Sequence, residues 1–228
     1  METTEKAGSV AAVCDGNLLT ELELSRRQRS AQSLAPTLRV LLDRVGWRPA
    51  DVDLVAVAIG PGSFTGLRIG VTTAKVFAYV AEADILGVDT LETIAAGAPE
   101  NVTSLWVAVD AQRGEVVAGS FQRDPDGWFR LSGPARLVEI DAWLAGLPAG
   151  SIITGPILRK LSDRVPSHVT PLAPEYWSAK AATVARLAAR DYAAGRRDDA
   201  WKLVPRYSRR SAAEEKWERK QRDGKTRS

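Results

Sequence analysis

The sequence of 228 residues has very little histidine and cysteine, with one residue of each, His168 and Cys14. A Cys/His zinc cluster and a paired-histidine metal site both need more of these residues, so both are excluded. A lone cysteine cannot pair within the chain and suits a reducing compartment, so we expect a cytoplasmic protein. A Ser-His-Asp triad would have to use His168, but no nucleophile motif lies near it. We therefore expect His168 to be an ordinary strand or loop residue.

Long hydrophobic runs are also missing. The longest uncharged stretch, 142–158, contains three glycines and two prolines, so it cannot form a spanning helix and we expect no membrane association. Hydrophobic residues at 45% and charged residues at 26% are typical of a globular protein with a core. Residues 206–228 carry nine Lys or Arg and four Asp or Glu, whereas the body is nearly neutral. This basic tail either contacts nucleic acid or is simply solvated.

The chain repeats one order of predicted elements. In the first half, the apolar spacing predicts a hairpin at 8–24 and strands at 53–59 and 85–88. It also predicts helices at 33–45, 64–81 and 89–97. The second half has predicted strands at 105–110, 115–122, 128–131 and 151–154, and predicted helices at 141–145 and 178–194. This repetition predicts an α/β fold of two similar lobes from a duplicated unit. We place the lobes at 1–103 and 104–205, followed by a partly helical tail at 206–228.

The repeat shows a difference at the start of the chain. In the second half, residues 104–109 supply a strand before the turn at Asp110, but only Met1 precedes the corresponding turn in the first half. Because strands usually have five or six residues, we expect about five residues to be missing from this strand. We expect the first strand to be truncated and the natural polypeptide to begin a few residues upstream.

The most informative segment is Ile59-Gly-Pro-Gly-Ser-Phe-Thr-Gly-Leu-Arg-Ile-Gly70. It predicts a buried strand, a tight turn and the start of a helix, where free N–H groups and the positive helix end suit an anion. Gly62, Ser63 and Thr65, with Asp110 from the second lobe, are therefore candidate anion-binding or nucleotide-binding residues. A tight strand-to-helix turn without a ligand is the alternative, and the spacing is not that of a Walker loop.

Small residues recur every four positions in the following helix, at Gly66, Gly70 and Ala74. A glycine inside a helix costs roughly 1 kcal/mol relative to alanine, so close packing must offset these two. This face packs either against a partner helix or against the chain's own sheet.

Three segments resemble the TsaB (YeaZ) family: Gly60–Gly70, Gly87–Glu92 and Val109–Val116. The resemblance covers nearly the whole chain and implies the two-lobed fold of actin-like ATPases and sugar kinases (the ASKHA fold). It also implies a scaffold or activator subunit that is not itself an enzyme. The family acts in the bacterial complex that adds threonylcarbamoyl to N6 of adenosine 37 in tRNAs reading codons that start with A.

The same resemblance implies partners and an interface. The chain would dimerise with its paralogue TsaD, which transfers the group, and would act with the ATPase TsaE, contacting tRNA through the complex. A homodimer of the isolated chain remains open. Two helices of the first lobe would form the partner surface, with the candidate residues Leu38, Leu42, Gly66, Arg68, Gly70 and Ala74.

No catalytic residue, metal ligand or tightly bound cofactor is expected. Residues 26–33 contain no histidine, although the catalytic paralogue holds its metal through a histidine pair on the corresponding helix. ATP and Mg²⁺ would enter the assembled complex through the partners.

An autonomous ATP-dependent phosphotransferase or ATPase of the same fold is the alternative function, because its chemistry needs only acids, glycine turns and Mg²⁺. Glu2 and Asp110 match the positions where kinases of this fold place Mg²⁺, but both residues could equally cap hairpin turns. A peptidase is disfavoured, because the chain has a single histidine.

Overall fold

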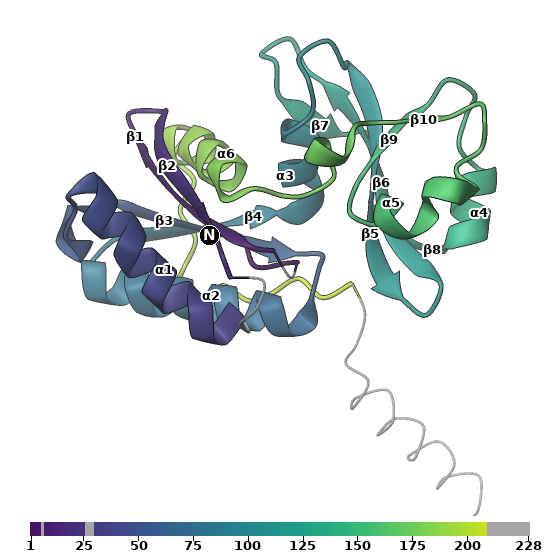
Figure 1. Ribbon diagram of the computed structural model, residues 1–228. Helices are drawn as coiled ribbons and strands as arrows, with labels where there is room; N and C mark the ends of the chain where they lie inside the picture. Colours follow the sequence, from purple (N-terminus) through teal and green to yellow (C-terminus); the bar gives the residue numbers. More distant parts are fainter. Residues whose placement is uncertain (6, 26–29, 209–228) are drawn as a thin grey trace, which may run out of the picture.

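The computed structural model describes residues 1–5, 7–25 and 30–208, which form two α/β lobes (Figure 1). The predicted tail helix lies outside these residues. The elements of the N-terminal lobe are β1 (Ser9–Cys14), β2 (Asn17–Glu23), α1 (Ser30–Val45), β3 (Leu54–Gly60), α2 (Phe64–Ala81), β4 (Asp84–Asp89) and α3 (Thr90–Ala96). The elements that follow are β5 (Ser104–Gln112), β6 (Glu115–Arg123), β7 (Phe129–Leu131), β8 (Arg136–Glu139), α4 (Ile140–Ala145), β9 (Ile152–Thr154), α5 (Leu158–Leu161), β10 (Thr170–Pro171) and α6 (Ala181–Ala193). None of the helices described here is long and apolar enough to span a membrane.

Local sequence signals set most of these boundaries. The β1–β2 hairpin turns at Asp15 and Gly16, which both have a positive φ, as predicted for an Asp-Gly turn. The side chain of Ser63 caps α2 and that of Asp89 caps α3, each accepting backbone N–H groups of the first turn. Helix α1 begins at Ser30, three residues earlier than predicted, so Pro36 lies inside the helix rather than in its first turn.

The two lobes differ in how their strands are joined. The C-terminal lobe has one sheet of order β10-β9-β5-β6-β7, with β8 also paired to β6. Its strand β5 lies between antiparallel β6 and parallel β9. In the N-terminal lobe, antiparallel β1–β2 and parallel β3–β4 are separate pairs, and residues at the N-terminus lie between them. The strands β8 and β10 and the short helix α5 were not predicted.

Helix α6 corrects the predicted lobe boundary at 104–205, because it packs on the N-terminal lobe. Its side chains Val184, Leu187 and Ala188 are buried in one cluster with Ala58 and Leu86 of the β3–β4 pair. In Figure 1, α6 covers the face of these strands opposite to α1 and α2. The N-terminal lobe is therefore discontinuous in sequence, since apolar periodicity predicts a buried helix face but does not identify the sheet that covers it.

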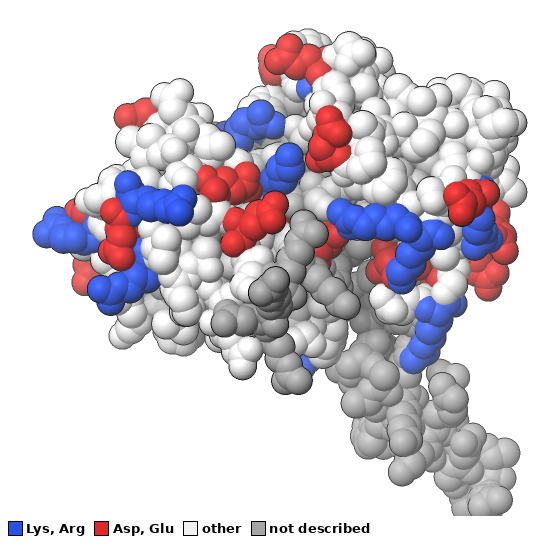
Figure 2. Space-filling view, viewed as in Figure 1, with Lys and Arg blue, Asp and Glu red and all other residues white. Residues whose placement is uncertain are grey.

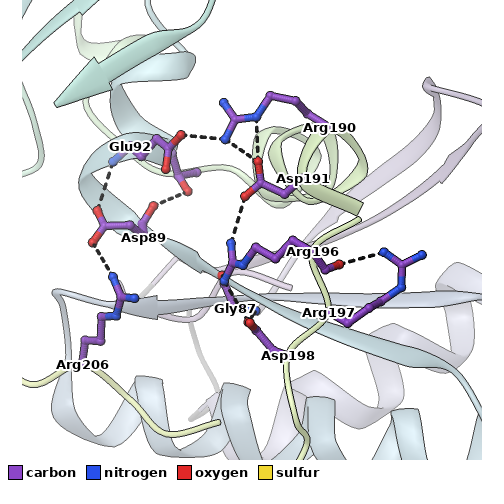
Figure 3. Close-up of polar contacts among 10 residues, drawn as sticks. Gly87, Asp89, Glu92, Arg190, Asp191, Arg196, Arg197, Asp198 and Arg206 are labelled. Atoms are coloured by element: carbon purple, nitrogen blue, oxygen red, sulfur yellow. Dashed lines mark hydrogen bonds and ion pairs between the residues drawn. The ribbon is translucent and has the colours of Figure 1, made fainter. Parts of the chain in front are cut away.

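Residues 195–207, here called the C-terminal strap, are fastened to the N-terminal lobe by charged groups (Figure 3). The carboxylate of Asp198 accepts hydrogen bonds from the backbone N–H of Gly87 and from Arg196, both at 2.8 Å. Arg196 also donates to the Gly87 carbonyl at 2.7 Å. Further along, the backbone N–H of Arg206 donates to the Ile59 carbonyl at 2.7 Å, and its guanidinium lies 3.9 Å from Asp89. The strap thus ends beside the turn that follows β3.

Candidate functional site

The turn between β3 and α2 is enclosed by the two ends of the described chain. On one side, the backbone N–H of Ser63 donates to the Thr4 carbonyl at 2.8 Å, and a Cβ at Gly62 would clash with Thr4. On the other side, a Cβ at Gly60 would clash with the carbonyl of Arg206. The two glycines of this turn therefore let neighbouring backbone approach closely.

These contacts occupy groups that an anion would need. The Ser63 N–H is used by Thr4, and the Gly66 N–H donates to the Ser63 hydroxyl at 3.2 Å. Ser63 and Thr65 have exposed side chains, whereas Asp110 lies in the other lobe and bonds to Gln112 and Lys160. An anion site at Gly62, Ser63, Thr65 and Asp110 stays a prediction, and these contacts favour the tight-turn alternative.

The small-residue face of α2 packs against Thr3 of the same chain. The Thr3 hydroxyl donates to the Gly66 carbonyl at 2.8 Å, and a Cβ at either Gly66 or Gly70 would clash with Thr3. Ala74 and Leu38 are buried in the core of this lobe. Four of the six predicted interface positions are therefore buried within the chain, which favours the intramolecular alternative, and the interface stays a prediction.

The other two predicted interface residues are accessible to different degrees. Leu42 is half-buried beside β1. Arg68 is exposed, and its guanidinium lies 3.9 Å from the centre of the Phe64 ring and donates to the Tyr207 hydroxyl at 2.8 Å. Within this chain Arg68 therefore holds the end of the C-terminal strap against the first turn of α2.

An exposed apolar stripe on α2 was not predicted as an interface. Val76, Tyr79 and Val80 are 59%, 77% and 66% exposed, and their spacing places them on one face of the helix. Val40 of the neighbouring helix α1 is also exposed. The signal in the sequence was an α2 segment that is apolar on more than one face, of which its own lobe can cover only part.

Glu2 and Asp110 occupy equivalent turns in the two lobes and make the same local contact. Each carboxylate accepts the backbone N–H two residues further on, Glu2 from Thr4 at 2.5 Å and Asp110 from Gln112 at 2.8 Å. Helix α5 then supplies cations to both regions. Lys160 lies 2.5 Å from Asp110, and Arg159 lies 2.5 Å from Glu5. The two acids therefore cap turns, as the alternative to a Mg²⁺ site predicted.

The environments of these acids differ in burial. Glu2 is completely buried, and among the described residues its Oε2 atom has no hydrogen-bond partner. Burial raises the pKa of Glu2 from 4.5 to about 7, against the opposing effect of the Thr4 hydrogen bonds. A carboxyl that holds its proton near neutral pH is a poor ligand for Mg²⁺. Over the described part of the chain, no group of three or more His, Cys, Asp or Glu side chains is placed to hold a metal.

His168 has the ordinary loop position that we expected. Its Nε2 atom lies 3.2 Å from the Leu147 carbonyl in the C-terminal lobe.

Charge on the surface of the two lobes is mixed, since Figure 2 shows Lys and Arg interspersed with Asp and Glu on the face in view. A broad basic face is not seen there.

The duplicated lobes and the strand-turn-helix segment between Thr4 and the strap define a two-lobed α/β protein of the actin-like ATPase and sugar-kinase fold. A family model described as "TsaD: tRNA N6-adenosine threonylcarbamoyltransferase" matches residues 19–133. The chain belongs to this family, and within it to the TsaB (YeaZ) group, as the following relatives show.

Curated relatives and solved structures agree on this group. The Escherichia coli (strain K12) protein "tRNA threonylcarbamoyladenosine biosynthesis protein TsaB" is 38% identical over 56% of this chain and 55% of its own length. The Bacillus subtilis (strain 168) protein of the same name is 30% identical over 63% of this chain and 62% of its own length. The chain thus spans little more than half the length of these relatives. YeaZ from Pseudomonas aeruginosa superposes with a TM-score of 0.77 at 27% identity, over 90% of this chain and 96% of that one. A second Pseudomonas aeruginosa structure, described as similar to peptidase YEAZ, superposes with a TM-score of 0.80. It is also 27% identical, over 91% of this chain and 97% of that one.

Gly70→Ala tests the packing of α2 on Thr3. The new methyl group collides with the Thr3 hydroxyl, which overpacks the contact by about 1–3 kcal/mol, while alanine regains roughly 1 kcal/mol of helix propensity. We expect a net loss of about 1 kcal/mol in the free energy of unfolding, measured with urea. Thr3→Ala removes the colliding group, so the double variant should lose less than the sum of the single variants. Strictly additive losses would contradict the packing described here.

Glu2→Gln tests the buried carboxyl. Because its pKa is raised, the folded state holds a proton that the unfolded state releases, so wild-type stability falls as pH rises from about 4.5 to about 7. The Glu2→Gln variant has no titrating carboxyl at this position, so its stability does not show this fall. We expect its free energy of unfolding, relative to wild type, to be about 2 kcal/mol more favourable at about pH 8 than at about pH 5.

The Met1 ammonium also contributes to the pH dependence of stability that this experiment measures. Burial lowers its pKa from 8.0 to about 6, so its contribution to stability rises with pH between those values. Both proteins contain this group, but the Glu2 carboxylate itself raises the Met1 pKa, so the difference between the two profiles reports Glu2 together with its effect on Met1. Parallel pH profiles for the two proteins would show that folding does not raise the pKa of Glu2.

Proposed function

We propose that this chain is a non-catalytic scaffold and activator subunit in the formation of threonylcarbamoyladenosine in tRNA, and that it acts by binding a TsaD-type paralogue. The names of the Escherichia coli and Bacillus subtilis relatives support the pathway. The family model, which describes the transferase, supports a paralogue as the partner. The observation that carries the proposal is the exposed apolar stripe Val76, Tyr79 and Val80 on α2.

This stripe has the properties of a helix-packing surface. Helices α1 and α2 lie next to each other on the outer face of the N-terminal lobe, away from α6 (Figure 1). A paralogue with the same duplicated topology presents an equivalent helix pair, and two such pairs can pack ridges into grooves as four helices. Tyr79, at 77% exposure, supplies the large aromatic side chain that commonly dominates binding energy at interfaces.

The chemistry is assigned to the partner. The chain's single histidine cannot form a histidine pair, and the carboxyls of Glu2 and Asp110 are engaged in turn caps. In the proposed assembly, TsaD transfers the threonylcarbamoyl group, the ATPase TsaE, ATP and Mg²⁺ act through the partners, and tRNA is contacted by the complex. This chain supplies the surface that holds TsaD in its active arrangement.

Tyr79→Asp tests the interface. A charge in the centre of the apolar stripe should weaken the heterodimer with TsaD about 30-fold or more, equivalent to the roughly 2 kcal/mol of a binding hot spot. Titration calorimetry measures the affinity. Leu137→Asp is the matched control, because Leu137 is also apolar and 42% exposed but lies on β8 of the other lobe. Equal affinities for Tyr79→Asp and wild type would remove α2 from the interface.

Reconstitution separates the scaffold from an autonomous phosphotransferase. We expect the purified chain to turn over negligible ATP with or without Mg²⁺, and TsaD to transfer threonylcarbamoyl to tRNA only when the chain is present. Transfer assays with each component omitted measure this dependence. Robust ATP turnover by the chain alone, abolished by Asp110→Ala, would instead establish the enzyme. Undiminished transfer without the chain would exclude the scaffold.

A further inference from the structure

The C-terminal strap holds a tryptophan out into solvent. Trp201 is 84% exposed, and Val204 on the same segment is 62% exposed. Leu203, which lies between them, is buried in the core of the N-terminal lobe. The strap is therefore anchored by one apolar side chain and presents two others, whose burial against a partner would be favourable.

Hydrogen bonds fix the turn that carries Trp201. Its N–H donates to the Asp199 carboxylate at 2.8 Å, and the N–H of Leu203 donates to the Asp199 carbonyl at 2.9 Å. Just before this turn, Asp198 accepts the N–H of Gly87 (Figure 3). A side chain on a fixed backbone loses little freedom when it binds, so Trp201 has the properties of a preorganised anchor.

The strap runs along the edge of α2 that carries Tyr79. Lys75 of α2 donates to the Trp201 carbonyl at 3.5 Å, and Arg68 of α2 donates to the Tyr207 hydroxyl at 2.8 Å. Tyr79 follows Lys75 by one helical turn and Arg68 by three, so these three side chains lie on one side of the helix. Trp201 therefore lies beside the apolar stripe of α2.

The α2 stripe is small for a stable interface. A standard interface buries about 800 Å² on each partner. The stripe has three side chains, and even a large aromatic side chain buries at most about 250 Å². Trp201 and Val204 supply further apolar surface, so a partner that covers the strap as well as α2 comes closer to the area of a standard interface.

Cations border these apolar side chains. Lys202 and Arg206 of the strap are exposed, and they lie 3.5 and 3.9 Å from acidic groups of this chain. Lys75 and Arg68 bond to uncharged groups of the strap. An apolar centre with a cationic rim is complementary to an apolar face that is edged with acidic side chains.

We propose that Trp201 and Val204 of the strap form a second part of the surface that binds the TsaD-type paralogue, which meets them with an apolar helix face edged by acidic side chains. This inference rests on the function proposed above, because it extends the same interface from α2 onto the strap.

RNA is the other class of ligand that suits an exposed tryptophan among cations, since bases stack on aromatic rings. The neighbouring exposed side chains favour a protein instead. Val76, Val80 and Val204 are aliphatic and offer no ring on which a base can stack.

Trp201→Ala tests the strap contact, by titration calorimetry of the full chain with TsaD. We expect the dissociation constant to rise about 30-fold or more, as at a binding hot spot. Leu137→Ala is the matched control and should leave the constant unchanged, because it truncates an exposed apolar side chain of the other lobe. Equal thermal midpoints for Trp201→Ala and wild type, expected for so exposed a side chain, show that the fold is kept.

Lys202→Glu tests the acidic edge of the partner, and it replaces an exposed side chain that the fold does not need. We expect it to weaken binding about threefold or more at low salt and to have a smaller effect at high salt, because rim charges are screened. An unchanged dissociation constant at low salt would contradict the acidic edge.

The outcomes separate this inference from the proposed function. Weaker binding by Tyr79→Asp with unchanged binding by Trp201→Ala would overturn the strap contact and leave the α2 interface in place. Unchanged binding by both variants would overturn both. If Trp201→Ala bound TsaD as wild type does but lowered tRNA retention by the assembled complex, the strap would be an RNA contact instead. Weaker binding by Trp201→Ala and Lys202→Glu, with Leu137→Ala unchanged, supports the strap contact.

Discussion

The N-terminal lobe depends on the hydrogen bonds of four residues, Met1–Thr4, with three different elements. Met1 bonds to β3, Glu2 bonds to the start of β1, and Thr3 and Thr4 bond to α2 and to the turn before it. These bonds are the backbone link between two strand pairs that are otherwise separate. Glycine at positions 62, 66 and 70 follows from this constraint, because a side chain at any of these three positions would displace Thr3 or Thr4.

Sequence patterns predicted the individual helices, strands and turns of this protein better than they predicted which of these elements pack against one another. The hairpin at Asp15-Gly16, helix α2 and the cap at Asp89 were predicted, since turn and capping chemistry are local. The family was also recognised from the block Gly60–Gly70. The covering of the small-residue face by Thr3 and the return of α6 to the first lobe were not predicted. Both are long-range contacts, and the helical period shows that a face is buried without showing what buries it.

The duplication explains what the two lobes share and where they differ. Glu2 and Asp110 keep the same turn-capping contact, although one is fully buried and the other is about one-fifth exposed and paired with Lys160. The shared contact maintains the fold of each half, because it orients the chain leaving the central strand. Their surroundings and charged neighbours differ, so a pattern of two matched acids in the sequence did not imply one shared metal site.

The return of α6 and the C-terminal strap to the N-terminal lobe also has a consequence for synthesis on the ribosome. Until residues 181–206 have emerged, the face of β3 and β4 that carries Ala58, Leu86 and Val88 lacks the cover of helix α6. The C-terminal lobe is continuous in sequence, so its sheet can close while the nascent chain still lacks the strap. The half of the protein that is translated first is therefore the half that is completed last.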